Sequence, residues 1–165
     1  MSKILISGYY GFANAGDEAM LTAIIESLRQ VEKNVELTVL SGNPEDTAAK
    51  HQVCSVYLFN PLGIIRAMKD SELIISGGGS LLQDVTSKRS LLYYLSIIGL
   101  GKFFGKKVML FAQGIGPIRA KWARKLTSLV CNEADLITVR DSESAAELIE
   151  MGVKPEKITV TADSV

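Results

Sequence analysis

The chain has 165 residues, of which 47% are hydrophobic and 22% charged, a mixture typical of a water-soluble globular domain with a sizeable core. Lysine and arginine number 18, and aspartate and glutamate also number 18, so the formal net charge is zero. That balance argues against a nucleic-acid-binding protein, which normally carries a basic excess. We therefore expect one globular domain over residues 1–165 and no nucleic-acid partner.

The cysteines and the start of the chain indicate a cytoplasmic protein. A strand pattern begins at residue 3, and no signal-peptide pattern precedes it. The most apolar run, residues 91–100, is too short to span a bilayer. Cys54 and Cys131 fit no metal-ligand spacing, and we interpret both as reduced thiols in the core. His51, the only histidine, lies in a polar connection, and we interpret it as a solvated loop residue, so no metal site is expected.

Short apolar runs alternate with helical patterns along the chain. Strands are expected at residues 3–7, 35–40, 53–57, 73–76, 108–112, 136–139 and 158–161. Helices are expected at residues 17–31, 45–50, 62–69, 90–104 and 119–132, and again from Asp141 to a C-terminal Gly152. Trp122, Leu126, Leu129 and Val130 are expected to form the buried face of the fifth helix, and Ala145, Leu148 and Ile149 that of the sixth. The alternation predicts an α/β fold with a Rossmann-like, mostly parallel sheet and helices on both faces.

Right-handed crossovers would bring every strand-to-helix loop to the carboxyl edge of this sheet, where ligands bind. The loops concerned are residues 8–17, 77–84, 113–117, 140–144 and 162–165, and they hold most of the glycine and polar clusters. The opposite loops carry plain turn residues. We therefore expect a ligand cleft at the carboxyl edge. Because a domain rarely stops in such a loop, we also expect the natural chain to continue past Val165.

Two glycine-rich loops are the main candidate ligand contacts. Glycines lack a Cβ atom, so a ligand can approach their backbone closely. The first loop contributes Gly77, Gly78, Gly79, Ser80, Gln83 and Asp84, and the second contributes Gln113, Gly114 and Gly116. The alternative is a pair of tight turns that bind nothing.

The loop after the first strand is rich in aromatic residues. Tyr9, Tyr10 and Phe12 lie within four positions, beside Gly11 and Asn14. Three aromatic rings on one loop favour a platform on which a sugar stacks, although core packing is the alternative. Asp17 follows and is expected to cap the first helix.

Arg140 directly follows a buried strand, and Asp141 begins the next helix. An arginine beside a helix N-terminus favours a phosphate or carboxylate ligand. The alternative is a structural ion pair of Arg140 with Asp141 or Asp163.

Several familiar chemistries are excluded. The spacing of Gly11 and Gly16 matches a Walker loop, but Asp17 stands where that motif needs lysine. The glycine spacing also fails the dinucleotide fingerprint, and no acidic residue ends the second strand. No nucleophile elbow surrounds Ser76 or Ser80.

Taken together, four motifs resemble the polysaccharide pyruvyltransferases, most of all their bacterial cell-wall branch. They are residues 8–19 (GYYGFANAGDEA), 77–84 (GGGSLLQD), 113–117 (QGIGP) and 138–141 (TVRD), and the likeness extends over residues 3–163. Ala13 departs from the pattern, because many relatives have glycine there, and we expect a slightly stiffer loop.

The resemblance implies the N-terminal half of a GT-B-like two-domain fold, with the C-terminal domain absent from this chain. It implies transfer of the enolpyruvyl unit of phosphoenolpyruvate to two hydroxyls of one sugar, as a cyclic ketal, with no cofactor. In the cell-wall branch the acceptor is N-acetylmannosamine of a lipid-linked polymer precursor, which implies work at the inner membrane face. Arg140 would hold the anionic donor and Asp17 could deprotonate an acceptor hydroxyl. The chain alone would be inactive. Two other functions stay open: a nucleotide-sugar glycosyltransferase of the same fold, and a non-catalytic sugar- or anion-binding module.

Overall fold

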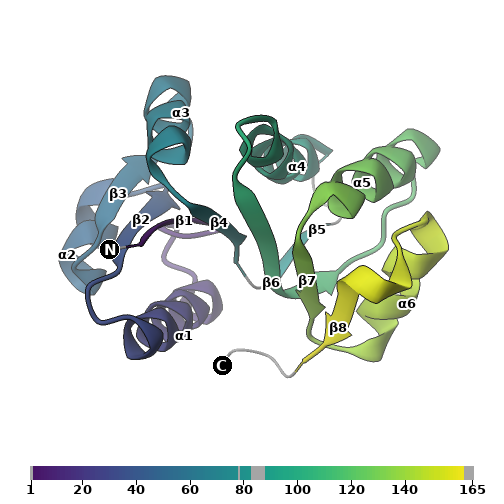
Figure 1. The fold of residues 1–165 in the computed structure, drawn as a ribbon, viewed down its shortest axis with the longest axis horizontal. Coiled ribbons are helices and arrows are strands. Elements are labelled where there is room, and N and C mark those ends of the chain that lie inside the picture. Colours follow the sequence, from purple (N-terminus) through teal and green to yellow (C-terminus); the bar gives the residue numbers. More distant parts are fainter. Residues whose placement is uncertain (1, 78, 83–87, 162–165) are drawn as a thin grey trace.

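A computed structural model describes residues 2–77, 79–82 and 88–161 and shows one parallel sheet flanked by helices (Figure 1). The strands are β1 (Lys3–Ser7), β2 (Glu36–Ser41), β3 (Cys54–Tyr57), β4 (Leu73–Ser76), β5 (Gly79–Leu82), β6 (Lys107–Ile115), β7 (Leu136–Val139) and β8 (Ile158–Val160). Their order is β3-β2-β1-β4-β6-β7-β8, and β5 also pairs with β6, beyond the segment that pairs with β4. Each pairing among these strands is parallel. The predicted α/β, Rossmann-like class is confirmed.

The helices connect these strands in the expected alternation. They are α1 (Ala15–Val31), α2 (Pro44–His51), α3 (Pro61–Asp70), α4 (Lys88–Phe103), α5 (Lys121–Glu133), α6 (Ser142–Met151) and the 3₁₀ turn η1 (Pro155–Lys157). In Figure 1, α3, α4 and α5 lie along one side of the sheet and α1 lies along the other. Asp141 caps the N-terminus of α6 and Gly152 ends it in the left-handed conformation, as predicted. Asn14, Asn43 and Asn60 cap α1, α2 and α3, which was not predicted.

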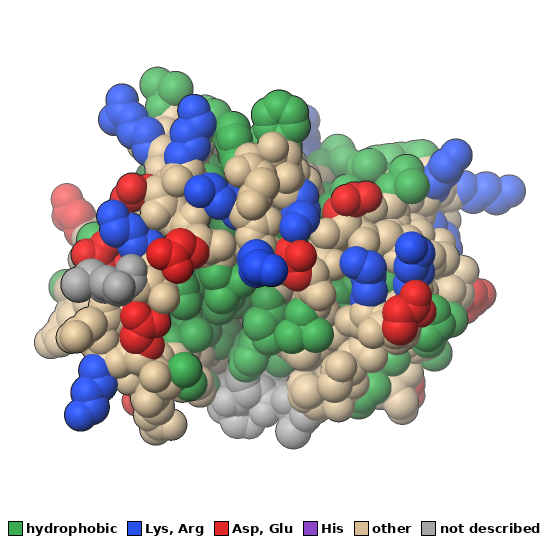
Figure 2. All heavy atoms as spheres, viewed as in Figure 1, with side chains coloured by type: hydrophobic (Ala, Val, Ile, Leu, Met, Phe, Trp, Pro, Cys, Tyr) green, Lys and Arg blue, Asp and Glu red, His purple; other side chains and the backbone are tan. Residues whose placement is uncertain are grey.

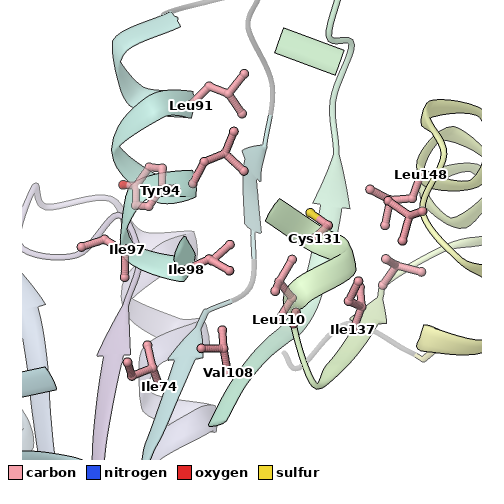
Figure 3. Close-up of a cluster of buried hydrophobic side chains, with 14 of the residues drawn as sticks. Ile74, Leu91, Tyr94, Ile97, Ile98, Val108, Leu110, Cys131, Ile137 and Leu148 are labelled. Atoms are coloured by element: carbon pink, nitrogen blue, oxygen red, sulfur yellow. The ribbon is translucent and has the colours of Figure 1, made fainter. Parts of the chain in front are cut away.

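Side-chain alternation in the central strands divides the core into two clusters. Successive residues of a strand point to opposite faces of the sheet. Ile4 and Ile6 of β1 therefore pack with α1, whereas Leu5 between them joins the cluster of α3, α4, α5 and α6. Figure 3 shows this larger cluster, to which α4 contributes Ile98, β6 contributes Val108 and α6 contributes Leu148. The sheet is thus covered on both faces at its centre.

Some predicted faces are wrong. Trp122 and Leu129 are 49% and 58% exposed, because α5 buries Ala123, Thr127 and Cys131 instead. Ile149 of α6 is likewise 45% exposed.

Two isolated side chains also differ from expectation. Cys54 is exposed, since it begins the edge strand β3, and only Cys131 is a core thiol, with a pKa raised by burial to about 12. His51 ends α2 rather than lying in a loop, and its Nε2 atom is buried.

Candidate functional site

The order of the strands reverses between β1 and β4. The chain runs outward from β1 through β2 to β3 and then returns to pair β4 with the other side of β1. The loop after β1 therefore leads toward β2, whereas the loop after the neighbouring strand β4 leads toward β6 on the other side. In open α/β sheets such a reversal forms the ligand crevice at the carboxyl edge. The first glycine loop and the aromatic loop both belong to this position.

Tyr10 lies inside this reversal point rather than on the surface. Its side chain is fully buried, and a Cβ atom added at Gly8 or Gly77 would overlap its ring or hydroxyl. Burial raises the pKa of the hydroxyl, which has no hydrogen-bond partner within the described part of the chain. The predicted three-ring platform is therefore wrong for Tyr10, because the bare backbone of two glycines accommodates this ring in the core.

The other two aromatic rings of the loop do form an exposed stack. The ring centroids of Tyr9 and Phe12 lie 4.4 Å apart, and the angle between the ring planes is 17°. Tyr9 is 44% exposed and Phe12 is 43% exposed. A pocket of about 270 Å³ beside them is lined by Leu58, Phe59, Arg89, Ser90, Tyr93 and Tyr94 as well. Gly11 makes the loop possible: its φ is +85°, and a Cβ there would overlap the Ser41 side chain.

Asn14, rather than the predicted Asp17, caps α1. The Oδ1 atom of Asn14 accepts a hydrogen bond of 3.1 Å from the backbone N–H of Asp17. Asp17 therefore lies in the first turn of α1, and its carboxylate is not the cap of the helix. Partial burial, together with the nearby charge of Glu18, raises the pKa of this carboxyl group. A raised pKa brings a carboxylate closer to the range in which it acts as a general base.

The second glycine loop begins later than predicted, because Gln113 and Gly114 lie within β6. Between its pairings with Ile137 and Val139 of β7, β6 contains one extra residue, a β-bulge. Ala112 occupies the bulge with a φ of +50°, and its N–H donates to Oγ1 of Thr138 at 2.7 Å.

Gln113, just after this bulge, joins the two central strands. Its side chain is fully buried, and its Nε2 donates to the carbonyl oxygens of Ser76 (3.0 Å) and Gly77. Its Oε1 has no partner among the residues the structure describes. The glutamine thus holds the end of β4, and the start of the first glycine loop, against β6.

Part of the first glycine loop is a strand that sequence reasoning missed. Gly79 and Ser80 belong to β5, and Gly79 pairs with Gln113. Gly78, Gln83 and Asp84 lie outside the described residues. A glycine in a strand cannot be told from a glycine in a loop by sequence alone, so β5 is identified only by its pairing with β6.

Arg140 lies over Gly114. A Cβ added at Gly114 would overlap the guanidinium group, so the side chain occupies the space that the glycine leaves open. The backbone N–H of Arg140 donates to the carbonyl of Gln113 at 3.1 Å, and its Nε lies 3.7 Å from Oδ2 of Asp141. The structural pair with Asp141 is therefore present. Because 35% of the side chain remains exposed, the arginine also faces solvent.

A polar pocket of about 530 Å³ lies beside this arginine. It is lined by Ile115, Gly116, Pro117, Ile118, Arg119, Arg124, Arg140, Asp141, Glu143, Ser144 and Glu147. Arg124 is paired with Glu147 at 2.6 Å, and Asp141 is the N-cap of α6, accepting from the N–H of Ser144 at 2.7 Å. That hydrogen bond, helped by Arg140, holds the pKa of Asp141 below its usual value. Arg119 and Arg124 were not predicted, although both follow the second glycine loop closely in the sequence.

Five of the predicted residues, Tyr10, Gly77, Gln113, Gly114 and Arg140, thus lie next to one another along the edge. Tyr10 contacts Gly77, Gly77 accepts from Gln113, and Gly114 lies under Arg140. Gly116 lines the polar pocket at the far end, while Phe12 lines the aromatic pocket at the near end. The two pockets are separate, and β4 and β6 lie between them in the sheet. Across residues 2–77, 79–82 and 88–161, no group of three or more His, Cys, Asp or Glu could hold a metal ion, and none of the helices there could cross a membrane.

Residues 14–165 match the family model described as polysaccharide pyruvyl transferase. The chain belongs to this family. No curated protein sequence matches it. The matched range includes Asp17, both glycine segments and Arg140, but it begins after Tyr10 and Phe12.

The solved structures that resemble this pyruvyl transferase domain share its fold at low identity. HepE from Anabaena, in complex with UDP and glucose, superposes with a TM-score of 0.68 at 13% identity, over 99% of this chain and 44% of that one. The lipopolysaccharide outer core galactosyltransferase WaaB gives 0.59 at 16%, over 97% and 45%. The UDP-GlcNAc 2-epimerase from Neisseria meningitidis, bound to UDP-GlcNAc, gives 0.57 at 14%, over 99% and 46%. The chain therefore spans less than half the length of these proteins.

Proposed function

We propose that this chain is the N-terminal half of a two-domain pyruvyltransferase that transfers the pyruvyl group of phosphoenolpyruvate to a sugar as a cyclic ketal. The family match carries the proposal, and the arginine over Gly114 at the carboxyl edge supports it. The C-terminal domain would cover this edge and supply further catalytic groups, so the chain alone is expected to be inactive. No cofactor is required.

The polar pocket beside Arg140 suits the donor. Phosphoenolpyruvate carries a phosphate and a carboxylate, and a guanidinium group can bind either with two parallel hydrogen bonds. Asp141 would repel an anion, but its Oδ1 is already engaged by the N–H of Ser144. Gly116 also lines this pocket, and its lack of a side chain would let a small anion approach the backbone there.

The reaction needs one protonation and two additions. A proton adds to the methylene carbon of the enol, which becomes the methyl group and leaves positive charge on the central carbon. One sugar hydroxyl forms a C–O bond to that carbon and loses its proton. Phosphate then leaves with the C–O bonding pair, and a second hydroxyl of the same sugar forms the second C–O bond to the central carbon and loses its proton, which the departing phosphate can accept. Arg140 would stabilise the departing phosphate. Asp17, with its raised pKa, would accept a hydroxyl proton.

The exposed Tyr9–Phe12 stack would contact the acceptor, because sugars stack on aromatic faces. By the likeness to the cell-wall branch, that acceptor is N-acetylmannosamine in a lipid-linked polymer precursor. A lipid-linked acceptor would place the protein in the cytoplasm at the inner face of the membrane. The two pockets are apart on this domain, so the C-terminal half would have to complete the path between them.

A nucleotide-sugar glycosyltransferase is the second candidate, favoured by the fold of neighbours whose structures contain UDP. A non-catalytic sugar- or anion-binding module is the third. Only the pyruvyltransferase releases phosphate from phosphoenolpyruvate, whereas only the glycosyltransferase binds a nucleotide sugar as donor.

Phosphate release by the full-length protein, with phosphoenolpyruvate and a β-N-acetylmannosaminyl lipid acceptor, tests the proposal. Arg140→Ala should lower kcat/KM for phosphoenolpyruvate by about 100-fold or more, the scale seen when one group that stabilises transition-state charge is removed. Arg29→Ala, which removes an exposed arginine of α1 that binds the carbonyl of Gln52, is the matched control. Transfer from UDP-glucose without any from phosphoenolpyruvate would favour the second candidate.

A further inference from the structure

Helix α4 is apolar on its outer face as well as its inner one. Leu91, Leu95 and Ile98 are buried against the sheet. On the opposite side, Leu92, Ser96, Leu100 and Phe103 follow one another at helical spacing, and all four are exposed, Phe103 by 81%. A helix that is hydrophobic all round normally has a partner on both sides.

The outer stripe of α4 continues across a groove onto α3. An apolar groove of about 280 Å³ lies between the two helices, with Phe59, Ile65, Ile97 and Leu100 among its walls. Phe59 and Leu62, at the start of α3, are 64% and 69% exposed. We call this surface the α3–α4 face; it comprises Phe59, Leu62, Arg66, Lys69, Leu92, Ser96, Leu100 and Phe103. Connected apolar surface of this kind marks an interaction site.

The two charged residues of the α3–α4 face, Arg66 and Lys69, are both basic, and Lys102 beside Phe103 is paired with Asp135. Helix α4 contains no aspartate or glutamate between Lys88 and Phe103, and it begins with Lys88 and Arg89. On α3, Leu62, Arg66 and Lys69 share the exposed side, and the one acidic residue, Asp70, is paired with Lys3 at 3.3 Å. In Figure 2, hydrophobic and basic side chains dominate the upper margin of the molecule, where Figure 1 shows α3 and α4.

We propose that the α3–α4 face docks on an anionic lipid bilayer. Exposed Phe and Leu side chains can enter the boundary between headgroups and acyl chains, while flanking lysine and arginine meet lipid phosphates. Each basic residue near such a surface adds to the attraction, which salt screens. Because the charged residues of this face are basic, an anionic lipid surface suits it better than an uncharged protein groove does.

The orientation of α4 places the Leu100–Phe103 end of this face away from the cleft of the proposed reaction, whereas Phe59 at the other end also lines the aromatic pocket. The helix leaves the carboxyl edge at Lys88 and ends at Phe103, just before β6 begins at the amino edge. A domain seated over the carboxyl edge would therefore leave Leu100 and Phe103 uncovered. The inference depends on the surface alone and stands whichever reaction the protein carries out.

Vesicle flotation tests the inference. The protein should float with phosphatidylcholine vesicles that contain phosphatidylglycerol and stay in solution with phosphatidylcholine alone. Two double variants test the apolar and the charged contributions separately. The first combines Leu100→Ser with Phe103→Ser, and the second combines Arg66→Glu with Lys69→Glu. Each should reduce the bound fraction by about 10-fold or more, because each removes a contribution to binding worth roughly 1–2 kcal/mol or more. Raising the salt concentration should release the protein, because screening weakens the charge contribution.

Matched controls use exposed positions elsewhere. Val31→Ser on α1, where the residue is 89% exposed, and Lys50→Glu on α2 should leave flotation unchanged. Circular dichroism of each variant checks that it is folded. Equal binding to both kinds of vesicle, or none to either, would overturn the inference. A concentration-dependent dimer that Phe103→Ser abolishes would also overturn it, because the face would then be an interface between copies.

Discussion

At the scale of single residues, Gly114 and Arg140 depend on each other. The guanidinium group lies where a Cβ of residue 114 would be, so Gly114→Ala should push the arginine out of position while β6 remains paired. In the full-length protein we expect kcat/KM for phosphoenolpyruvate to fall by about 10-fold or more, because a misplaced charge-stabilising group loses most of its effect. Gly99→Ala is the control, since its new Cβ would meet nothing within 4 Å. Unchanged kinetics in Gly114→Ala would remove the role proposed for this pair.

Ala13 offers a second test at this scale. Its φ is +58°, a conformation that costs a residue with a Cβ roughly 1–2 kcal/mol, whereas glycine adopts it freely. Glycine also loses more chain entropy on folding, by about 0.4–1 kcal/mol. Ala13→Gly should therefore raise the free energy of unfolding by up to about 1 kcal/mol in a urea titration. Ala15→Gly, at the first position of α1, should lower it instead. A loss of stability in Ala13→Gly would show that the loop does not hold the conformation described here.

At the scale of elements, the bulge in β6 determines where Gln113 points. The N–H of Ala112 is buried and bonded to the hydroxyl of Thr138, which lies on the neighbouring strand. Thr138→Val keeps the shape and removes the acceptor, so it should cost about 1–3 kcal/mol, the penalty for an unpaired buried donor. Thr159→Val in β8, where the side chain is exposed, should change stability by less than about 0.5 kcal/mol. Equal effects of the two substitutions would contradict this account of the bulge.

The same elements show what the sequence could predict. Apolar periodicity located the six α-helices of the described chain and every strand in it except β5, and the caps at Asp141 and Gly152 were predictable because they depend on residues within one turn. The bulge depends on Thr138, 26 residues from Ala112, and β5 depends on its pairing with β6. The burial of Tyr10 depends on Gly77, far along the chain. Such long-range partners leave no periodic signal, so the site was predicted as a set of loops rather than as the row of contacts that it is.

At the scale of the whole molecule, the sheet joins the two core clusters into one structure. Ile4 and Leu5 are consecutive in β1 but pack into different clusters, and Ile74 and Ile75 in β4 do the same. A substitution that disturbs one cluster therefore also disturbs strands that form part of the other cluster. We expect unfolding to be a single cooperative transition, as in most domains of this size.

Ile24→Ala tests this cooperation. Ile24 is 2% exposed on α1, and its truncation should lower the free energy of unfolding by about 2–5 kcal/mol. Trp122, the only tryptophan, lies on α5 and belongs to the side of the sheet away from α1. Its fluorescence and the far-ultraviolet circular dichroism should therefore shift to the same lower urea midpoint. Val31→Ala, at the exposed end of α1, should change the free energy of unfolding by less than about 0.5 kcal/mol and leave both midpoints nearly those of the parent. Loss of helical signal at a urea concentration where Trp122 still reports a folded environment would mean that the two clusters unfold separately.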